Sequence, residues 1–208
     1  GDLKQFRQLG SLTPGHPEYG HTVGVDATTG PLGQGLGMAV GMAMGQAHLA
    51  TVFNKPGYDL FDHYVYALAG DGCMMEGISS EALSLAGTLK LEKLIILYDS
   101  NNISIEGNTN ITFTENVSDR VKAFGFETLT VKDGDNLDEV LAALEKAKTI
   151  KGKPKFIEIK TTIGKDSPNE GSESTHGAPL GVDNIKALKE KLGLPQEEFY
   201  VPEEVYDY

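Results

Sequence analysis

Acidic and amide side chains follow two apolar runs near the middle of the chain. The first run, residues 65–69, leads into a Gly-Asp-Gly tripeptide whose acid is Asp71. The second run, residues 94–98, leads into Asp-Ser-Asn-Asn, whose first amide is Asn101. Carboxylate and amide oxygens are ligands that Mg²⁺ prefers, and it commonly shares them with substrate phosphates. The pattern therefore predicts a magnesium and phosphate site.

A helical pattern separates the two runs, from about residue 76 to residue 89. Its apolar face carries Ile78, Ala82, Leu85 and Leu89. Strand, helix and strand in this order indicate a β-α-β unit, whose parallel strands lie roughly 4.8 Å apart. Loops at their carboxyl ends can therefore converge on one ion, although 30 residues separate Asp71 from Asn101.

Two features of the first loop suit a diphosphate group. Gly70 and Gly72 carry no side chain, so a ligand can approach the backbone closely. The helix that begins near Glu76 presents free N–H groups and the positive end of its dipole, and both favour an anion.

The rest of the chain continues the alternation of helices and strands. We expect helices at 32–52, 115–124, 137–150 (with Asn136 as N-cap) and 182–192, and strands at 127–131 and 155–160. This order predicts an α/β fold with three layers, in which helices cover both faces of a mostly parallel sheet. Residues 161–181 are polar and glycine-rich, and such long loops are usually functional or disordered.

The helix expected at 32–52 contains glycines at every fourth position: Gly33, Gly37, Gly41 and Gly45. An interior glycine costs a helix about 1 kcal/mol relative to alanine, so these residues need a packing reason. The spacing suits either a tightly packed core helix or a helix at a subunit interface, and both interpretations stay open.

Composition limits the possible function classes. With 208 residues, we expect one domain. The formal net charge of −12 argues against binding of nucleic acid or anionic membranes, and the most apolar stretch, 32–52, is interrupted by polar residues. The single cysteine, Cys73, suits a reducing compartment, so we expect a cytoplasmic protein. Cys73 itself is either a small buried residue or a reactive thiol.

Four segments carry a resemblance to a known family. The Gly-Asp-Gly and Asn-Asn pair resembles the thiamine-diphosphate motif, and GDGCMMEGISSEALSLAGTLKLEKL, which begins at Gly70, is similar to transketolase specifically. TPGHPEYGHT at 13–22, ATTGPLGQG at 27–35 and STHGAPLG at 174–181 resemble transketolase segments in the same order. The resemblance covers nearly the whole chain.

The resemblance implies the diphosphate-binding domain of the thiamine-diphosphate fold, over residues 1–208. It implies an enzyme of the pentose phosphate pathway that transfers a two-carbon ketol unit between sugar phosphates, with thiamine diphosphate and Mg²⁺ (or Ca²⁺) as cofactors. It also implies a homodimer and a pyrimidine-binding domain, on the same or a separate chain, without which these residues are inactive. The chain begins at Gly1 without methionine, so we expect a fragment or one half of a split enzyme.

The resemblance also implies roles for individual residues. The expected metal ligands are Asp71, Asn101 and the carbonyl oxygen of Ile103. The expected cofactor-binding residues are Gly30, Pro31, Leu32, Gly72, Glu76, Asn101, Ile163 and His176. The expected catalytic residues are His16 and His176, and Glu76 is expected to share a carboxylate network with Glu81. The family's ylide-promoting glutamate and two further histidines match nothing in this chain.

Two departures and two alternatives accompany this interpretation. Residues 99–102 and the charged segment 164–167 differ from the family pattern, which weakens the assignment of substrate contacts near Ile163. One alternative is a relative that resembles dihydroxyacetone synthase, with the same cofactors and another acceptor. The other is a non-catalytic module that binds cofactor or acts as a scaffold.

Overall fold

The computed structural model describes residues 1–208 and divides them into two compact units. The first unit comprises Gly1–Ser100 and Phe113–Thr161, and the second comprises Asn101–Thr112 and Thr162–Tyr208. Each unit is described by itself below. The expectation of one domain over residues 1–208 remains a prediction.

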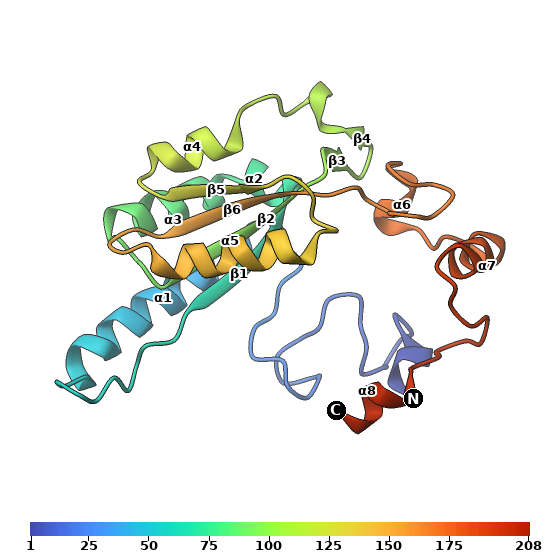
Figure 1. The fold of residues 1–208 in the computed structure, drawn as a ribbon, viewed down its shortest axis with the longest axis horizontal. Helices are drawn as coiled ribbons and strands as arrows, with labels where there is room; N and C mark the ends of the chain where they lie inside the picture. Colours follow the sequence, from blue (N-terminus) through green and yellow to red (C-terminus); the bar gives the residue numbers. More distant parts are fainter. The chain divides into compact units, whose positions relative to one another are not determined.

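A four-stranded parallel sheet forms the centre of the first unit (Figure 1). In spatial order its strands are β1 (Val65–Gly70), β2 (Leu94–Ser100), β6 (Lys155–Lys160) and β5 (Glu127–Val131). The three pairings are all parallel, which confirms the α/β fold that the alternating elements predict. The central strands β2 and β6 are rich in Leu, Ile and Phe because helices cover both of their faces.

Helices pack on the two faces of this sheet. On one face, α1 (Gln34–Phe53), α3 (Gly77–Thr88) and α4 (Val117–Ala123) enclose a core with Leu94, Ile96 and Phe156. On the other face, α5 (Leu137–Thr149) covers Ile95 and Ile157. Figure 1 shows α5 running along the sheet. Asn136 caps α5 as expected, because its Oδ1 accepts a hydrogen bond of 3.2 Å from the Glu139 N–H. The first unit therefore has the expected three layers.

The apolar face expected for α3 is wrong. Ile78, Leu85 and Leu89 are each 45 or 46 % exposed, although Ala82 is buried. The residues that face the core are Ser79, Ala82, Leu83 and Ala86. Small side chains at three of these four positions let α3 lie close to α1 and the sheet, so the larger apolar residues point outward.

The tight loop expected after β1 is also different in the structure. Asp71 begins a five-residue helix, α2 (Asp71–Met75), which directly precedes α3. Met74 of α2 is buried in the core, so this short helix is held by packing. A helix of this length forms in a protein only through such contacts, because its own nucleation is unfavourable.

Helix α1 packs with only part of its surface. Leu36, Ala39, Val40 and Ala43 are buried, and Gly37 approaches Ile78 of α3. A Cβ added at Gly41 or Gly45 would meet no atom within 4 Å. Packing within this chain therefore does not explain the glycines at positions 41 and 45.

Helix α1 is long and apolar enough, by length and composition, to cross a membrane. A core helix of a water-soluble protein passes the same test. In the first unit α1 packs against α3, β1 and β2 as an outer layer on the sheet. Length and composition are therefore weak grounds for a membrane assignment here.

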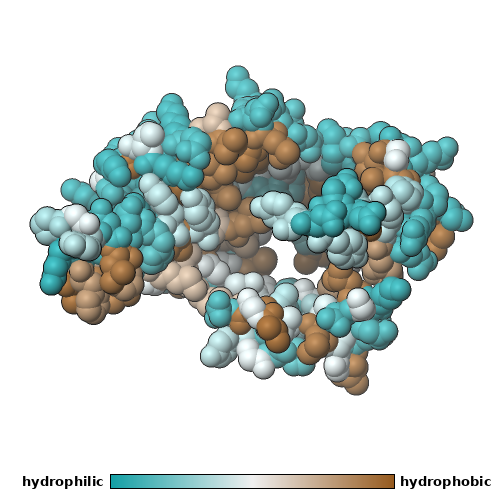
Figure 2. Space-filling model, turned by 60° about the horizontal axis from the view of Figure 1, so that its bottom comes forward, coloured by the Kyte–Doolittle hydropathy of each residue, from teal (hydrophilic) through white to brown (hydrophobic).

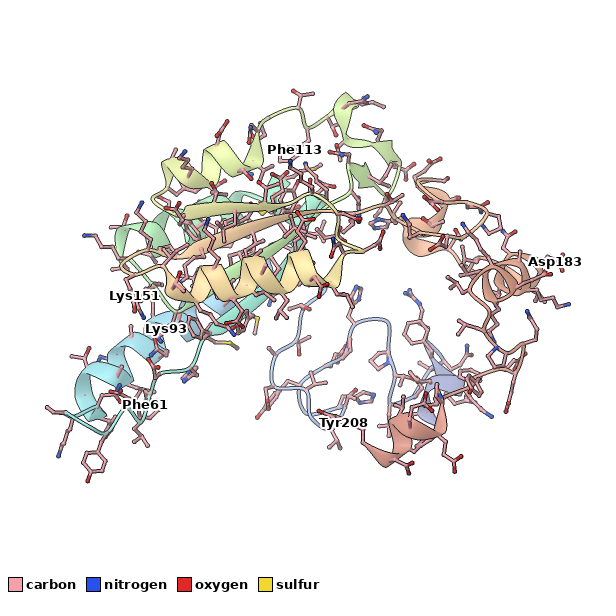
Figure 3. All side chains as sticks on the ribbon, in the orientation of Figure 1. Phe61, Lys93, Phe113, Lys151, Asp183 and Tyr208 are labelled. Atoms are coloured by element: carbon pink, nitrogen blue, oxygen red, sulfur yellow. The ribbon has the colours of Figure 1, made fainter.

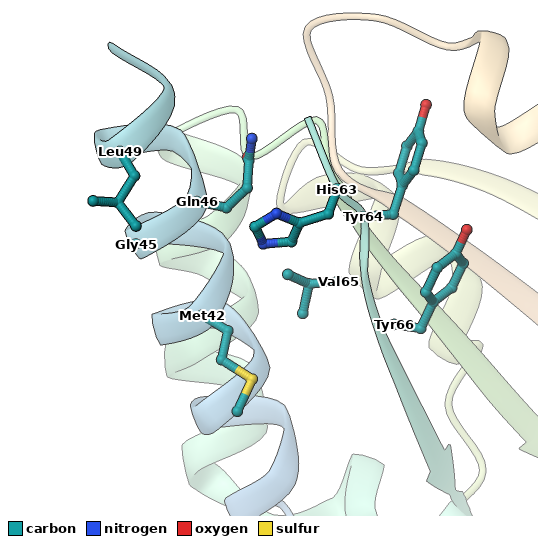
Figure 4. A pocket seen from close by; sticks show the side chains of 8 residues that line it. All are labelled: Met42, Gly45, Gln46, Leu49, His63, Tyr64, Val65 and Tyr66. Carbon is teal, nitrogen blue, oxygen red and sulfur yellow. The ribbon is translucent and has the colours of Figure 1, made fainter. Parts of the chain in front are cut away.

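The edge strand β1 leaves apolar surface uncovered. Tyr66 and Leu68 are exposed on the face opposite α1, Leu68 to 75 %. A groove of about 470 Å³ lies between α1 and β1; His63 and Val65 point toward α1, and Tyr64 and Tyr66 point away from it (Figure 4). Figure 2 shows patches of apolar side chains among hydrophilic ones on the surface drawn there.

A buried lysine closes the amino end of the sheet. Lys155 is 1 % exposed, and its Nζ donates hydrogen bonds to the carbonyl oxygens of Glu92 and Ile150, which precede β2 and β6. Burial lowers the pKa of Lys155 to about 8, because desolvation disfavours the ammonium ion. Lys93 and Lys151, labelled in Figure 3, lie at the same end of the sheet.

The second unit contains short elements. β3 (Ile103–Ser104) and β4 (Gly107–Asn108) form an antiparallel pair followed by the 3₁₀ turn η2 (Thr109–Ile111). α6 (Ser174–Gly177) interrupts the long loop expected at 161–181. α7 (Val182–Lys191) matches the last expected helix, and α8 (Glu203–Asp207) lies in the acidic tail. The remaining short element, η1 (Asp2–Gln5), belongs to the first unit.

Gly87→Ala should destabilise the fold by about 3 kcal/mol, because the added methyl group overpacks a backbone contact. A Cβ at Gly87 of α3 would lie 1.8 Å from the carbonyl oxygen of Phe124, directly after α4. Urea unfolding followed by circular dichroism measures the change. Gly77→Ala in the same helix is the control, because its Cβ would meet nothing within 4 Å. Equal stability of the two variants would contradict the close approach of α3 to α4.

Candidate functional site

The carboxyl ends of β1, β2 and β6 meet along one edge of the sheet. Gly70 of β1 lies opposite Asp99 of β2, and Ser100 of β2 lies opposite Lys160 of β6. In parallel α/β sheets this edge is where ligands bind. Asp71 directly follows Gly70, so the structure positions this carboxylate at the expected edge of the first unit.

Asp71 is a buried carboxylate, 4 % exposed, with a specific donor. The hydroxyl group of Tyr98, in the neighbouring strand, donates a short hydrogen bond to its Oδ1. An ionised carboxylate is costly to bury unless hydrogen bonds or a cation compensate it. The burial of Asp71 at a strand end is therefore consistent with an oxygen ligand for a hard cation such as Mg²⁺.

Tyr98 is itself held firmly in the core. It is 3 % exposed, and its ring centroid lies 5.5 Å from that of Phe156 on β6. Burial raises the pKa of Tyr98 well above its ordinary value, and the hydrogen bond and charge of Asp71 raise it further. The phenol therefore keeps its proton at neutral pH and acts as the donor.

Ser100 belongs to a polar network on the same face of the sheet as Tyr98. The Glu158 Oε1 accepts hydrogen bonds from Ser100 Oγ at 3.2 Å and Lys160 Nζ at 2.6 Å. Its Oε2 accepts one from Ser118 Oγ of α4 at 2.9 Å. Burial favours the neutral acid, but the bonds from Lys160 and Ser118 outweigh it and hold the pKa of Glu158 below its ordinary value. This network connects β2, β6 and α4 beside the candidate site.

Asp99 makes the corresponding connection on the opposite face. Its Oδ1 accepts a short hydrogen bond from the Thr161 hydroxyl, directly after β6, and the Thr161 N–H reaches the Ser100 carbonyl at 3.4 Å. Tyr98, Asp99 and Ser100 therefore tie the end of β2 to both neighbouring strands.

The loop before α1 packs against the start of α2 and α3. The Cδ1 of Leu32 lies 3.0 Å from the position of a Cβ at Gly72. Gly33 has a φ of +81°, and a Cβ there would lie 3.0 Å or less from atoms of Glu76 and Ser79. Larger residues at Gly72 or Gly33 would push this loop away, so the sequence keeps glycine at both positions.

His16 reaches the same loop from the turn-rich amino-terminal region. A Cβ at Gly30 would lie 3.2 Å from Cγ of the His16 ring, so the imidazole stacks against the glycine backbone. His16 is exposed and therefore accessible to a ligand. Within the first unit, the structure thus brings His16 to Gly30, and Leu32 to Gly72.

Arg120 of α4 fixes the far end of α2. It donates to the Met74 carbonyl oxygen at 2.6 Å and to Ser80 Oγ at 2.7 Å, and it pairs with Glu115 at 2.7 Å. The carboxyl end of α2 and the first turn of α3 are thereby held in place beside Asp71.

Four of the expected residues lie in the second unit: Asn101, Ile103, Ile163 and His176. The Asn101 Oδ1 accepts a 2.9 Å hydrogen bond from the Ile103 N–H, and Asn102 has a φ of +61°. Asn101 and Asn102 therefore form a turn, and the amide oxygen of Asn101 retains a second lone pair for a ligand.

Ile163 and His176 lie in the long loop of the second unit. The Ile163 carbonyl oxygen accepts a 2.8 Å hydrogen bond from the Gly171 N–H, which closes the loop on itself. His176 is exposed in α6. The roles of these residues, and the sharing of one cation by Asp71, Asn101 and Ile103, stay predictions.

The sequence reasoning missed the residues that bond Asp71 and the end of β2 to neighbouring elements. Tyr98, Thr161, Glu158 and Ser118 have no role in the sequence interpretation. The alternation of side chains along β2 places Tyr98 and Ser100 on one face and Asp99 on the other, and this was the one available signal. Their partners are distant in sequence, so only the folded chain identifies them.

Comparison with protein families identifies the chain. The model of the family described as "Transketolase, thiamine diphosphate binding domain" matches residues 1–208. The chain belongs to the transketolase family. It is 58 % identical to the transketolase of Geobacillus stearothermophilus over 207 residues and 56 % identical to transketolase 1 of Saccharomyces cerevisiae over 209 residues. These two matches cover 99 % and 100 % of this chain, and 31 % of each relative.

Solved transketolase structures share the fold. Transketolase from Leishmania mexicana matches with a TM-score of 0.96 and 53 % identity. The Pichia stipitis transketolase complex with sedoheptulose-7-phosphate matches with a TM-score of 0.97 and 49 % identity. Each match covers 99 % of this chain and 31 % of the solved chain. The chain therefore spans about a third of the length of these transketolases.

Glu158→Gln should destabilise the first unit by about 2 kcal/mol at pH 7. The change removes the negative charge that accepts hydrogen bonds from Ser100, Lys160 and Ser118. The folded state lowers the pKa of Glu158, so its contribution is present above pH 4.5 and disappears as the pH falls through the folded-state pKa. Urea unfolding of the wild type and the variant at several pH values measures the difference between their free energies of unfolding, called the gap below.

The gap between wild type and Glu158→Gln should therefore be largest above pH 4.5 and close in more acidic solution. Glu145→Gln is the control, because Glu145 pairs with Lys148 on the exposed surface. A gap that is constant with pH would show that the network at Glu158 does not stabilise the carboxylate.

Proposed function

We propose that the chain is the diphosphate-binding part of a transketolase, which transfers a two-carbon ketol unit between ketose and aldose phosphates in the cytoplasm. The observation that carries the proposal is the buried Asp71 at the carboxyl end of β1, next to the end of β2 in a parallel sheet. The family match over residues 1–208 supports it. A solved relative is described as a complex with sedoheptulose-7-phosphate, which fits sugar phosphates as the substrate class.

The residues of the first unit fit a diphosphate cofactor with a divalent cation. Asp71 offers a buried carboxylate oxygen, and Gly72, which has no side chain, lies close to Leu32. We assign Asp71, Asn101 and the Ile103 carbonyl oxygen as ligands of Mg²⁺ or Ca²⁺. We assign Gly30, Pro31, Leu32, Gly72, Glu76, Asn101, Ile163 and His176 to cofactor contacts.

Thiamine diphosphate, when bound, supplies an electron sink for the carbanion of ketol transfer. The chain's own residues bind and orient the cofactor and the substrate, and they exchange protons with the substrate. We assign His16 to the hydroxyl or ketone oxygen of the donor sugar, and His176 to the phosphate groups of cofactor and substrate. An imidazole can donate, accept or move a proton near neutral pH, which suits both roles.

Uncovered apolar surface supports a need for further protein parts. Tyr66 and Leu68 of the edge strand β1 are exposed, and α1 leaves Met42 and Met44 exposed. Large apolar patches on a protein surface usually mark interaction sites. We propose that the complete enzyme includes a pyrimidine-binding domain and that residues 1–208 alone do not catalyse ketol transfer.

The exposed stripe of α3 supports a homodimer. Ile78 and Leu85 of α3, with Leu89 directly after it, are exposed apolar residues, and α3 packs against α1, which carries the open glycine positions Gly41 and Gly45. Glycines allow two helices to approach closely, and an apolar row beside them favours burial in an interface. This arrangement favours the interface interpretation of the glycine repeat.

Asp71→Asn in the complete polypeptide that contains these residues should weaken Mg²⁺ binding by more than about 100-fold, because a neutral amide replaces the anionic ligand. Calorimetric titration of Mg²⁺ with thiamine diphosphate present measures the affinity, and ketol transfer should fall with it. The control is Asp62→Asn, which removes a carboxylate paired with Lys93 at the opposite end of the sheet.

Three results would contradict parts of this proposal. Wild-type affinity in Asp71→Asn would exclude this carboxylate as a ligand. A complete polypeptide that binds no thiamine diphosphate in the presence of Mg²⁺ would favour a scaffold module. Turnover by residues 1–208 alone would refute the proposed need for a second domain.

Leu85→Lys should convert a dimer to monomers at micromolar concentration, because a buried unpaired ammonium group opposes association. Sedimentation velocity measures the oligomeric state, and circular dichroism checks that the fold is intact. Leu141→Lys is the control, since Leu141 is exposed on α5 at the other face of the sheet. A Leu85→Lys protein that remains dimeric would exclude α3 from the interface.

A further inference from the structure

Tyr98 and Asp71 form a buried pair that connects β2 with the start of α2. We propose that Tyr98 is a positioning residue, which holds the Asp71 carboxylate in the orientation that a divalent cation requires. This inference rests on the proposed function, because it assumes that Asp71 is a metal ligand. It adds a residue that touches neither metal nor substrate and acts through Asp71.

The geometry makes Tyr98 a rigid donor. Tyr98 is only 3 % exposed and its ring packs against Phe156, so the core sets the position of the hydroxyl group. The hydroxyl donates directly to Asp71 Oδ1. The pair joins adjacent parallel strands, since Tyr98 lies opposite Ala69, two residues before Asp71. A shift of the Asp71 carboxylate would therefore break a bond whose other partner cannot follow.

A fixed carboxylate matters because its last torsion angle is otherwise soft. The χ2 angle of an aspartate has a broad, roughly two-fold distribution, so packing alone does not define the carboxylate plane. Mg²⁺ demands oxygen ligands in near-octahedral directions and tolerates little misorientation. A donor on Oδ1 defines the plane and the direction in which the remaining lone pairs point. Hydrogen bonds to ligand side chains typically contribute about 10- to 100-fold in metal affinity.

Position 98 allows the hydroxyl group to be tested separately from the ring. Phenylalanine at this position would keep the ring and its contact with Phe156 while removing only the hydroxyl group.

The test is Tyr98→Phe in the complete polypeptide, with Tyr64→Phe as the matched control. Tyr64 directly precedes β1, and its hydroxyl group donates a 3.1 Å hydrogen bond to the carbonyl oxygen of Lys148 in α5. Each variant loses one buried or half-buried hydroxyl bond, so both should lower the melting temperature slightly. Only Tyr98→Phe should weaken Mg²⁺ binding, by about 10-fold or more, in calorimetric titrations with thiamine diphosphate present.

A positioning role also separates metal dependence from turnover. At saturating Mg²⁺, Tyr98→Phe should regain most of the wild-type kcat, because Tyr98 does not touch the substrate. The concentration of Mg²⁺ that gives half-maximal activity should rise in parallel with its dissociation constant. Unchanged Mg²⁺ affinity in Tyr98→Phe, or a kcat that saturating Mg²⁺ does not restore, would overturn the inference.

The Asp71→Asn variant separates this inference from the proposed function. If Asp71→Asn loses Mg²⁺ binding and Tyr98→Phe keeps wild-type affinity, the metal ligand stands and the positioning role fails. If both variants bind Mg²⁺ as the wild type does, the proposed metal site fails as well.

Discussion

The structure depends on the parallel pairing of β1 with β2. This pairing sets Gly70 level with Asp99, and it places the residues after both strands at one edge of the first unit. Asp71, the first residue of α2, and Asp99, near the end of β2, are almost thirty residues apart in sequence. A shift of one residue in the register would turn every side chain of β2 to the other face. The candidate site therefore depends on main-chain hydrogen bonds in the sheet before it depends on any side chain.

Polar side chains at the end of β2 convert this register into a rigid edge. Tyr98 contacts the residue after β1, while Asp99 and Ser100 contact residues of β6 or just beyond it. Buried polar groups of this kind add specificity to a core only when each finds its partner. Here they fix three strand ends relative to one another, and they do so next to the carboxylate that the proposed function requires. The opposite end of the sheet has its own polar closure at Lys155.

Helices α1 and α3 show how small residues can serve two surfaces. Ala82, Ala86 and Ser79 let α3 pack closely against its neighbours, and the larger residues of the same helix remain outside. Glycines of α1 contact α3 at one end of the helix and open surface at the other. Close packing within the unit and apolar exposure outside it are therefore consequences of one arrangement. The edge strand β1 also leaves apolar side chains exposed, although a parallel strand with apolar faces is normally covered.

The sequence by itself determined the α/β class, the strands β1, β2, β5 and β6, and the family to which the chain belongs. Alternating apolar runs and helical patterns are local signals, and the Gly-Asp-Gly and Asn-Asn segments are contiguous motifs, so neither needs the fold. Only the tertiary structure decided the buried face of α3, the short helix α2 and the partners of Asp71, Asp99 and Glu158. The physical reason is that each depends on contacts between residues distant in sequence: the core selects a helix face by shape, and a buried carboxylate takes the donor that a neighbouring strand presents.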